Sequence, residues 1–163
     1  MNVALKARPR AVVRTATKQR LRLWLRLLRT TRAMEAQLRE RLRVQFDTTL
    51  PQFDVMAGLA RKPDGMSMTE LSHMLIVSNG NVTGIIDRLV SERLVARLPA
   101  QHDRRAFVVK LTPKGQAHFD KCARAHQEWV DKILSEISAE DAEMLIGYFE
   151  GLPERIRSGT KRL

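Results

Sequence analysis

The residues best suited to binding chemistry lie on one segment, Ser78–Val90. Its apolar residues recur at helical spacing and predict one buried face, made of Val82, Ile85, Ile86, Leu89 and Val90. The opposite face is small and polar; it consists of Gly80, Asn81, Gly84, Asp87 and Arg88, flanked by Asn79 and Thr83. Glycine and asparagine lower helix stability, and a solvated face usually carries Glu, Lys or Gln instead. A face without bulk allows a helix to enter the major groove of DNA, where amide and backbone groups reach base edges.

A charged hairpin follows this helix. Residues 94–98 and 107–111 have the composition of two strands, and Pro99–Ala106 connects them. The connection contains Gln101, His102, Asp103, Arg104 and Arg105. Arginines at the tip of such a hairpin suit the narrow minor groove and its phosphates, whereas a solvated turn is the plain alternative. Helix and hairpin together predict a winged helix.

Two shorter helical segments precede the polar-faced helix. The first has Pro51 in its first turn and ends before the turn at residues 62–65. Its expected buried face is Phe53, Met56, Leu59 and Ala60. Ser67 and Glu70 form a capping box for the second segment. Because Ser78 caps the polar-faced helix after a connection of about three residues, the spacing is that of a helix-turn-helix.

Long helical patterns flank this lobe. A leucine-rich stripe runs through residues 18–44, a second follows the Thr112-Pro113 cap as far as Ile137, and a third follows Ser138 as far as Ile156. These stripes exceed what one small lobe covers, so we expect a homodimer. The predicted fold is mainly α with a small β-hairpin. It comprises a basic arm at 1–17, a dimerisation helix at 18–45, a winged helix-turn-helix lobe at 46–112 and C-terminal dimerisation helices at 113–163.

The basic charge is concentrated at the N-terminus. The net charge is +11, and residues 1–32 hold ten Lys and Arg residues with no acid before Glu35. Such an arm suits DNA, RNA, an anionic lipid surface or a phosphorylated small molecule. The alternative function is therefore a basic RNA- or nucleoid-binding protein without ligand response. That alternative explains the arm but not the helix lined with glycine and asparagine.

The remaining composition indicates a compartment. No run of eighteen uncharged apolar residues occurs, and the single cysteine, Cys122, has no partner for an internal disulfide. Both observations predict a cytoplasmic protein without a membrane span. The arginine-rich start also resembles a transit peptide, but no break separates Arg14 from the helical pattern that follows.

The sequence gives weaker support for a metal site or for an enzymatic activity. His118, Cys122 and His126 fall on one helical face and could share zinc or copper, but they span roughly 12 Å on a straight helix. A buried interface position explains them better, and a peroxide-sensing thiol would need exposure and a lowered pKa. The sequence contains no phosphate-binding loop, Gly-x-Ser-x-Gly or His-Glu-x-x-His. We predict neither an enzyme nor a bound cofactor or metal.

A set of short motifs between Leu50 and Gly115 carries a family resemblance. They are Glu70-Leu71-Ser72, Val77-Ser78, Val82-Thr83, Ile86-Asp87-Arg88-Leu89, Leu94-Val95, Asp103-Arg104-Arg105 and Leu111-Thr112-Pro113-Lys114-Gly115. The combination resembles the MarR family of winged-helix transcriptional regulators. Arg93 departs from it, because the family commonly has glycine after this helix. A left-handed residue there would be strained by about 1 kcal/mol, so we expect the helix to close differently.

The resemblance implies a homodimer that binds a pseudo-palindromic double-stranded operator and represses promoters until a small effector binds. Each polar-faced helix would enter a major groove and each wing would reach a minor groove. The implied DNA-binding residues are Ser78, Asn79, Gly80, Asn81, Thr83, Gly84, Arg88, Asp103, Arg104 and Arg105. Among these, Asp103 is expected to hold an arginine in place.

The resemblance also implies an effector site, since family effectors are often aromatic or phenolic acids bound between the dimer helices and the winged lobe. An arginine-rich helix beside such a pocket could bind a carboxylate or the phosphates of an acyl-coenzyme A thioester. The residues implied are Arg22, Arg26, Arg29, Arg32, Phe53, Met56 and Phe119. The polar-faced helix is also similar to that of a branch sensing aromatic acyl-coenzyme A esters. Alternatively, the arginines bind only DNA phosphates.

Overall fold

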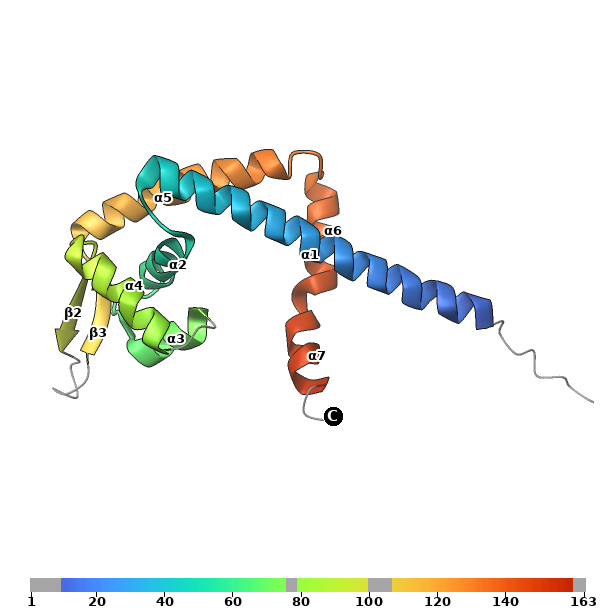
Figure 1. The fold of residues 1–163 in the computed structure, drawn as a ribbon, viewed down its shortest axis with the longest axis horizontal. Helices are drawn as coiled ribbons and strands as arrows, with labels where there is room; N and C mark the ends of the chain where they lie inside the picture. Colours follow the sequence, from blue (N-terminus) through green and yellow to red (C-terminus); the bar gives the residue numbers. More distant parts are fainter. Residues whose placement is uncertain (1–9, 76–78, 100–106, 160–163) are drawn as a thin grey trace, which may run out of the picture. The chain divides into compact units, whose positions relative to one another are not determined.

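The computed structural model describes residues 10–75, 79–99 and 107–159 (Figure 1). The chain divides into two compact units, one up to Cys122 and one from Ala123 onward. Within the described residues, no helix has the length and apolar character needed to cross a membrane. The mainly helical fold class with a small sheet, expected from the sequence, is confirmed.

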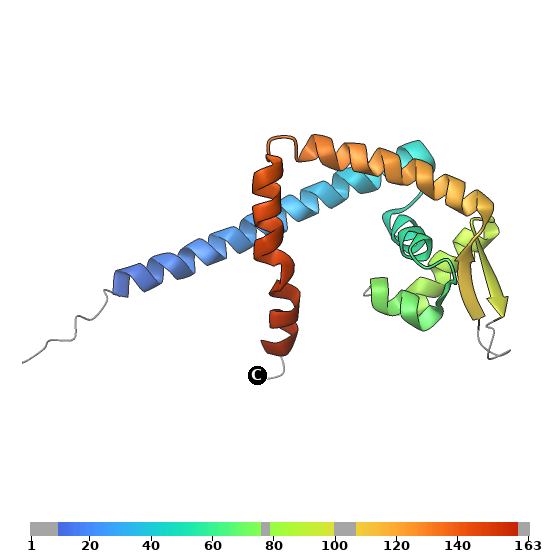
Figure 2. The same cartoon turned by 180° about the vertical axis from the view of Figure 1, so that it is seen from behind.

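The first helix, α1, spans Arg10–Phe46 and is unbroken in Figure 1; Figure 2 shows its N-terminal half from behind. It begins eight residues before the predicted start at Lys18. Its C-terminal part carries the buried side chains Leu38 and Leu42. The helix ends at Phe46, and the next residue, Asp47, has a φ of 48°, a left-handed conformation that aspartate tolerates.

Helix α2 spans Leu50–Ala60 and begins with a reciprocal cap that the sequence analysis did not identify. The Gln52 N–H donates to Thr49 Oγ1 at 3.3 Å, and the Thr49 N–H donates to Gln52 Oε1 at 2.8 Å. Two of the helix's orphan donors are therefore satisfied. Phe53, Met56 and Leu59 are buried, as predicted.

A short strand, β1 (Met66–Ser67), leads into helix α3 (Met68–Leu75). The predicted capping box is confirmed, because the Ser67 N–H donates to Glu70 Oε2 at 2.8 Å and the Glu70 N–H donates to Ser67 Oγ at 3.2 Å. Lys62 Nζ adds an ion pair to Glu70 at 2.9 Å. Together these contacts lower the pKa of Glu70 to about 2, the backbone donor at Ser67 contributing most.

Helix α4 (Asn79–Ser91) and strands β2 (Val95–Pro99) and β3 (Phe107–Leu111) complete the lobe. The sheet is antiparallel with the order β1-β3-β2, so the predicted hairpin gains a third strand. Helices α2, α3 and α4 share one core with the sheet. Its buried members are Val55, Met56, Leu59, Met66, Leu71, Val82, Ile86, Leu89, Leu94, Val95 and Val109.

The C-terminus of α4 corrects one expectation. Arg93 adopts a φ of 59°, the left-handed conformation usually given to glycine. The Leu94 N–H donates to the Leu89 carbonyl and the Arg93 N–H to the Val90 carbonyl, each at 2.9 Å. This pair of bonds is a Schellman closure. We expected this helix to end without a left-handed residue at Arg93, and that prediction was wrong. The hydrogen bonds to the Leu89 and Val90 carbonyls hold Arg93 in the left-handed conformation.

Helix α5 spans Pro113–Ile133 and continues from the first unit into the second, which also contains α6 (Ala139–Glu150) and α7 (Leu152–Gly159). The predicted cap at Ser138 is confirmed by a 3.1 Å bond from the Asp141 N–H. Two expectations were wrong: α5 ends four residues before Ile137, and the single last helix is two helices separated at Gly151. Pro153 has no N–H to continue the α6 ladder, which accounts for the break.

Candidate nucleic-acid interface

The exposed face of α4 is small and polar, as predicted. Thr83, Gly84, Asp87 and Arg88 are exposed, while Val82, Ile86 and Leu89 on the other side have no accessible surface. A Cβ added at Gly84 would meet no atom within 4 Å. Packing within the chain therefore does not require a glycine here, although glycine weakens a helix.

Several residues predicted at this interface cannot be described in full. Asn79, Gly80 and Asn81 belong to the backbone of α4, but their side chains are outside the described part. Residues Ser78, Asp103, Arg104 and Arg105 lie outside the described residues altogether.

An ion pair connects the wing to α4. Arg97 Nη2 on β2 lies 2.7 Å from Asp87 Oδ1 on α4. Because Arg97 stands opposite Val109 in the central strand, the pair joins the middle of the hairpin to the exposed side of the helix. This pair links the hairpin to α4 at the surface of the lobe.

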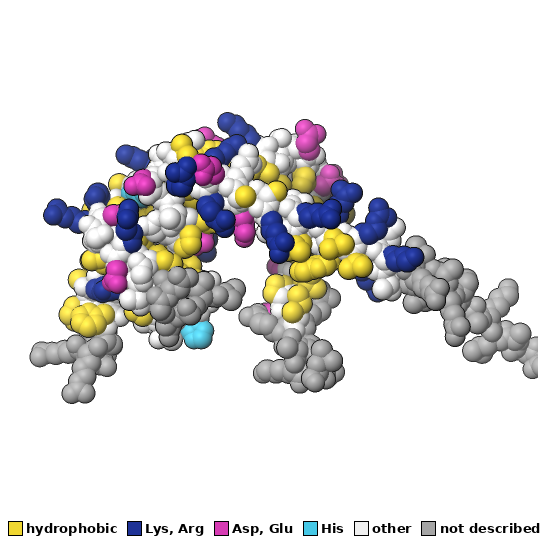
Figure 3. Space-filling view, viewed as in Figure 1, with side chains coloured by type: hydrophobic (Ala, Val, Ile, Leu, Met, Phe, Trp, Pro, Cys, Tyr) yellow, Lys and Arg dark blue, Asp and Glu magenta, His cyan; other side chains and the backbone are white. Residues whose placement is uncertain are grey.

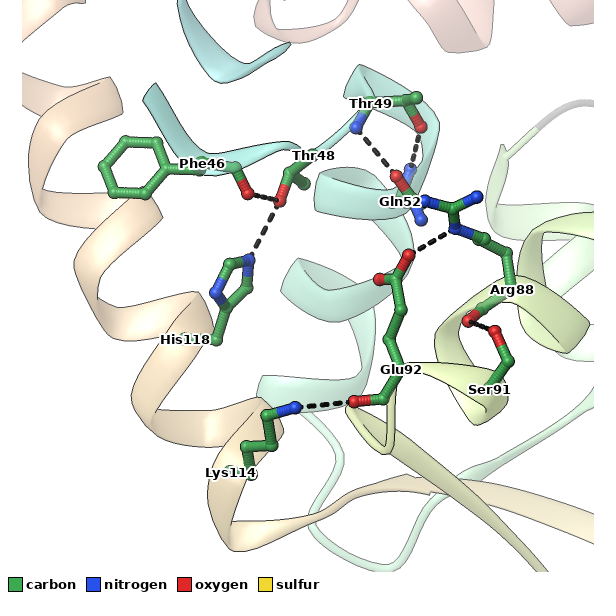
Figure 4. A network of polar contacts seen from close by, with 9 residues as sticks. All are labelled: Phe46, Thr48, Thr49, Gln52, Arg88, Ser91, Glu92, Lys114 and His118. Atoms are coloured by element: carbon green, nitrogen blue, oxygen red, sulfur yellow. Dashed lines mark hydrogen bonds and ion pairs between the residues drawn. The ribbon is translucent and has the colours of Figure 1, made fainter. Parts of the chain in front are cut away.

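Arg88 forms a second ion pair with Glu92, the residue that directly follows α4 (Figure 4). The Glu92 backbone carbonyl accepts a hydrogen bond of 2.8 Å from Lys114 Nζ. The hydrogen bond to Glu92 raises the pKa of Arg88, which remains cationic. Since the Arg88 side chain is well exposed, an incoming anion can compete with Glu92 at little cost.

A pocket of about 400 Å³ lies between α4 and the corner that joins α1 to α2. Its lining residues are Arg43, Asp47, Thr48, Thr49, Gln52, Gly84, Ile85 and Arg88. Two guanidinium groups therefore border one cavity, and both are paired with glutamates: Arg43 with Glu40 at 2.6 Å and Arg88 with Glu92. Gly84 and Arg88 belong both to this pocket and to the predicted DNA face.

A polar network behind the pocket links the α1–α2 corner to α5 (Figure 4). Thr48 Oγ1 donates to the Phe46 carbonyl at 2.9 Å and lies 2.8 Å from His118 Nε2. A hydroxyl has one hydrogen, so while Thr48 donates to the Phe46 carbonyl, the His118 Nε2–H is the donor to Thr48. Burial lowers the pKa of His118, which favours its neutral form.

Cys122 lies beside this network, with its Sγ 3.6 Å from His118 Nε2. The thiol is buried, and burial raises its pKa. Such a thiol does not suit a redox sensor. Among the residues that the structure describes, no group of three metal-ligating side chains occurs, so His118 and Cys122 come together without a third ligand.

Comparisons with known proteins connect this architecture to one family. A sequence profile of the MarR family matches residues 46–106. The transcriptional regulator PecS of Dickeya dadantii is 32% identical over 92 residues, and the chain spans about half of it, 55%. A MarR family transcriptional regulator from Silicibacter pomeroyi is 33% identical and superposes with a TM-score of 0.72 over 86% of this chain and 97% of that one. The chain belongs to the MarR family.

A DNA complex of another MarR protein shares the architecture. A mutant MarR from Escherichia coli, solved in complex with operator DNA, is 27% identical and has a TM-score of 0.72. The alignment covers 82% of this chain and 95% of that chain. The described winged lobe and helices therefore match a MarR protein whose structure contains DNA.

The Leu-Thr-x-x-Gly motif of this MarR chain has a steric basis. Thr112 Oγ1 accepts the Gly115 N–H at 2.9 Å and donates to the Arg93 carbonyl at 2.7 Å. A Cβ at Gly115 would lie 1.8 Å from the Leu94 carbonyl oxygen. Only glycine permits the first turn of α5 to approach the end of α4 this closely.

The residues predicted to bind an effector fall in different places. The Phe53 and Phe119 rings lie 5.7 Å apart, whereas Met56 is fully buried in the lobe core. The four predicted arginines are exposed on α1; they are Arg22, Arg26, Arg29 and Arg32. None of the seven lines the pocket beside α4. The sequence analysis missed Arg43 and Gln52, because only folding brings the α1–α2 corner next to α4.

Proposed function

We propose that this MarR-family chain is a homodimeric transcriptional repressor that places α4 in the major groove of a pseudo-palindromic operator. The observation that carries the proposal is the bare outer face of α4 at Gly84, where open space surrounds a glycine that the fold does not need. A groove of DNA needs that space, because backbone and short side chains must approach base edges closely. The operator DNA bound to a related MarR protein supports the same partner.

The DNA contacts divide by chemistry. Ser78, Asn79, Gly80, Asn81, Thr83 and Gly84 would face base edges and nearby phosphates. Arg88 would exchange Glu92 for a phosphate, a contact that sets position rather than sequence. In the wing, Arg104 and Arg105 would reach the minor groove, and Asp103 would orient one of them.

The second unit supports the homodimer. A groove of about 1140 Å³ opens among α6, α7 and the end of α5. Its apolar lining includes Val130, Leu134, Ile137, Leu145, Ile146 and Phe149. Apolar side chains on α1 are also exposed, including Leu21 and Trp24 at 57% each. Surfaces of this extent are usually covered in an assembly, and a second copy is the simplest partner.

We infer that the effector is a small anionic aromatic acid bound in the pocket beside α4. Arg43 and Arg88 supply cationic donors that a ligand would share with Glu40 and Glu92, and Ile85 supplies apolar surface. The Asp47 carboxylate also lines the pocket, so the ligand's carboxylate would lie on the side of the two arginines. A volume of about 400 Å³ is near the lower end for ligand sites, so the acid fits better than its whole coenzyme A thioester. The exposed α1 arginines Arg22, Arg26, Arg29 and Arg32 are the alternative contact for the phosphates of the thioester, and Phe53 and Phe119 for its aromatic group.

A ligand in this pocket would interfere with DNA directly. Gly84 and Arg88 line the pocket and also belong to the proposed DNA face. A bound carboxylate would occupy the Arg88 guanidinium that otherwise meets a phosphate. The two ligands are then mutually exclusive, and each lowers the apparent affinity of the other.

The test of DNA binding is fluorescence anisotropy with duplexes from the chain's own upstream region, in about 150 mM salt. We expect tight binding to one duplex, a footprint with two protected half-sites about one helical turn apart, and weak binding to random duplex. Arg105→Ala should weaken operator binding without changing dimerisation, while Arg61→Ala at the end of α2 serves as the basic control. Equal affinity for all duplexes, or for RNA, would support the nucleoid- or RNA-binding alternative instead.

The effector proposal has its own test. Benzoate, salicylate and benzoyl-coenzyme A are titrated into the protein–operator complex, and Arg43→Ala is compared with Arg26→Ala. If the pocket binds the acid, Arg43→Ala makes release require at least about tenfold more ligand and leaves operator affinity unchanged. If only Arg26→Ala alters release, the effector lies along α1 and the pocket assignment fails.

A further inference from the structure

The end of the β2–β3 hairpin bears an apolar pair with no partner in the lobe core. Phe107 stands opposite Pro99 in the antiparallel register, and its side chain is 52% exposed. Two residues further along β3, Val109 is fully buried. Because side chains alternate along a strand, Phe107 lies on the core-covering face of the sheet, beyond the edge of the core.

This face is turned toward α4. Arg97 lies between Val95 and Pro99 on the same face of β2, and its guanidinium reaches Asp87 of α4. The Phe107–Pro99 pair is the next pair outward from that ion pair. Figure 3 shows hydrophobic atoms gathered at this end of the hairpin, beside a basic and an acidic side chain.

The fold alone does not account for an aromatic residue at this position. A strand end that is half solvated accepts threonine or another polar residue equally well. A bare phenyl ring next to proline instead provides a rigid apolar surface beside the polar face of α4. Exposed apolar surface adjoining a binding face usually extends that face.

We propose that the Phe107 ring packs against a deoxyribose of the DNA strand that passes between the groove occupied by α4 and the groove reached by the wing. The inference rests on the proposed function and adds a residue to it. A phenyl ring has no hydrogen-bonding group, so it reads no base; the C–H face of the sugar is its complement. The contact is therefore independent of sequence and positions the wing.

Salt dependence separates this contact from the ionic ones. Cationic contacts release counterions, so removing one changes the slope of affinity against salt concentration. Removing an apolar contact lowers affinity by the same factor at every salt concentration. Phe107→Ala and Arg105→Ala should consequently differ in slope even where their affinities at one salt concentration are alike.

The experiment compares wild type, Phe107→Ala, Phe107→Leu and Leu98→Ala by anisotropy on the operator and on random duplex between about 50 and 300 mM salt. Leu98 is the matched control, because it is 43% exposed at the same hairpin end but lies on the opposite face. We expect Phe107→Ala to weaken both duplexes by about tenfold with an unchanged salt slope, Phe107→Leu to retain most of the affinity, and Leu98→Ala to bind like wild type.

Each other outcome overturns the inference. Unchanged affinity of Phe107→Ala would remove the residue from the interface. Equal losses in Leu98→Ala, or a lowered melting temperature in both variants, would show that the hairpin is merely destabilised. A change in oligomeric state at constant DNA affinity would assign the ring to a protein contact. If wild type binds no duplex at all, the proposed function itself fails, which is a distinct result.

Discussion

Apolar side chains are buried in the core of the winged lobe but exposed on helix α6. In the lobe, Leu71, Val82, Ile86 and Leu89 have no accessible surface. In α6, whose twelve residues are all described, none is buried, and Ile146 remains 59% exposed. The lobe thus has a hydrophobic core of its own, whereas α6 exposes its apolar residues.

This difference indicates which region depends on a partner. A helix that is apolar around much of its circumference is normally enclosed on all sides, and short helices alone are marginal in water. Each of the two regions also contains one helical glycine with free space around it. Gly84 and Gly147 both sit inside helices with no atom within 4 Å of an added Cβ. We infer that one faces DNA and the other faces a second copy of the chain.

The largest expected effect comes from placing a charge on the exposed apolar face of α6. Ile146→Asp should prevent dimerisation, because a carboxylate would have to be buried in the groove lined by Ile146 and Leu145. Operator affinity should then fall on the order of 100-fold, since the two half-sites are no longer bound together. Light scattering and anisotropy at matched concentrations measure the two effects.

The control for this variant is Ile146→Leu, which keeps the apolar volume and should remain dimeric. The circular dichroism of the lobe should also persist in Ile146→Asp. A dimeric Ile146→Asp with wild-type operator affinity would show that α6 does not hold the copies together.

Gly84→Ala separates stability from function within the lobe. The added methyl has free space, so the isolated protein should gain about 0.5–1 kcal/mol in unfolding free energy from better helix propensity. Operator affinity should fall by about tenfold, because the methyl intrudes where the groove approaches α4. Urea unfolding and anisotropy are measured on the same preparation. Gly147→Ala, on α6, should instead weaken the dimer; a loss of stability in Gly84→Ala would mean that the open space is occupied in solution.

Arg93→Gly tests whether the lobe's stability is local. Arg93 has a φ of 59° at the Schellman closure of α4, a conformation that glycine adopts without strain. The variant should be more stable by about 0.5–1 kcal/mol, after allowance for the greater freedom of glycine in the unfolded chain. Urea unfolding should show this gain at every protein concentration. A concentration-dependent gain would mean that this corner contributes to the dimer.

Local signals in the sequence predicted much of the lobe correctly. The Ser67–Glu70 capping box, the Thr112-Pro113 start of α5 and the apolar face of α4 depend on residues within a few positions of one another, and all are confirmed. The Thr49–Gln52 capping box is equally local, but it was not predicted. Only Pro51 was used as a signal for the start of this helix. Pro153 was likewise a visible signal for the division between α6 and α7.

Non-local features could not be obtained in this way. Strand β1 has two residues, too few for a pattern, and exists because Met66 and Ser67 pair with β3 more than forty positions later. The pocket depends on the approach of Arg43 and Arg88 from different helices. Met56 was predicted both on the buried face of its helix and as an effector residue, and it is fully buried in the core. Helical periodicity shows which side chains point inward, but it does not distinguish a core position from the wall of a pocket.

The smallest expected effect concerns Glu70, whose pKa is lowered to about 2 by the Ser67 N–H and Lys62. Because a depressed pKa means that the folded state favours the carboxylate, this stabilisation is complete above the unfolded pKa of about 4.3 and is lost as the pH falls toward 2. Glu70 is 48% exposed, so the contribution should stay below about 1 kcal/mol.

The unfolding free energies of wild type and Glu70→Gln, measured with urea, should therefore differ slightly at pH 6 and converge between pH 4 and pH 2. The dimer equilibrium should not respond to this substitution, because the contact lies wholly within the lobe. A difference that persists at pH 2, or that varies with protein concentration, would contradict the view that the lobe is stabilised by its own local contacts.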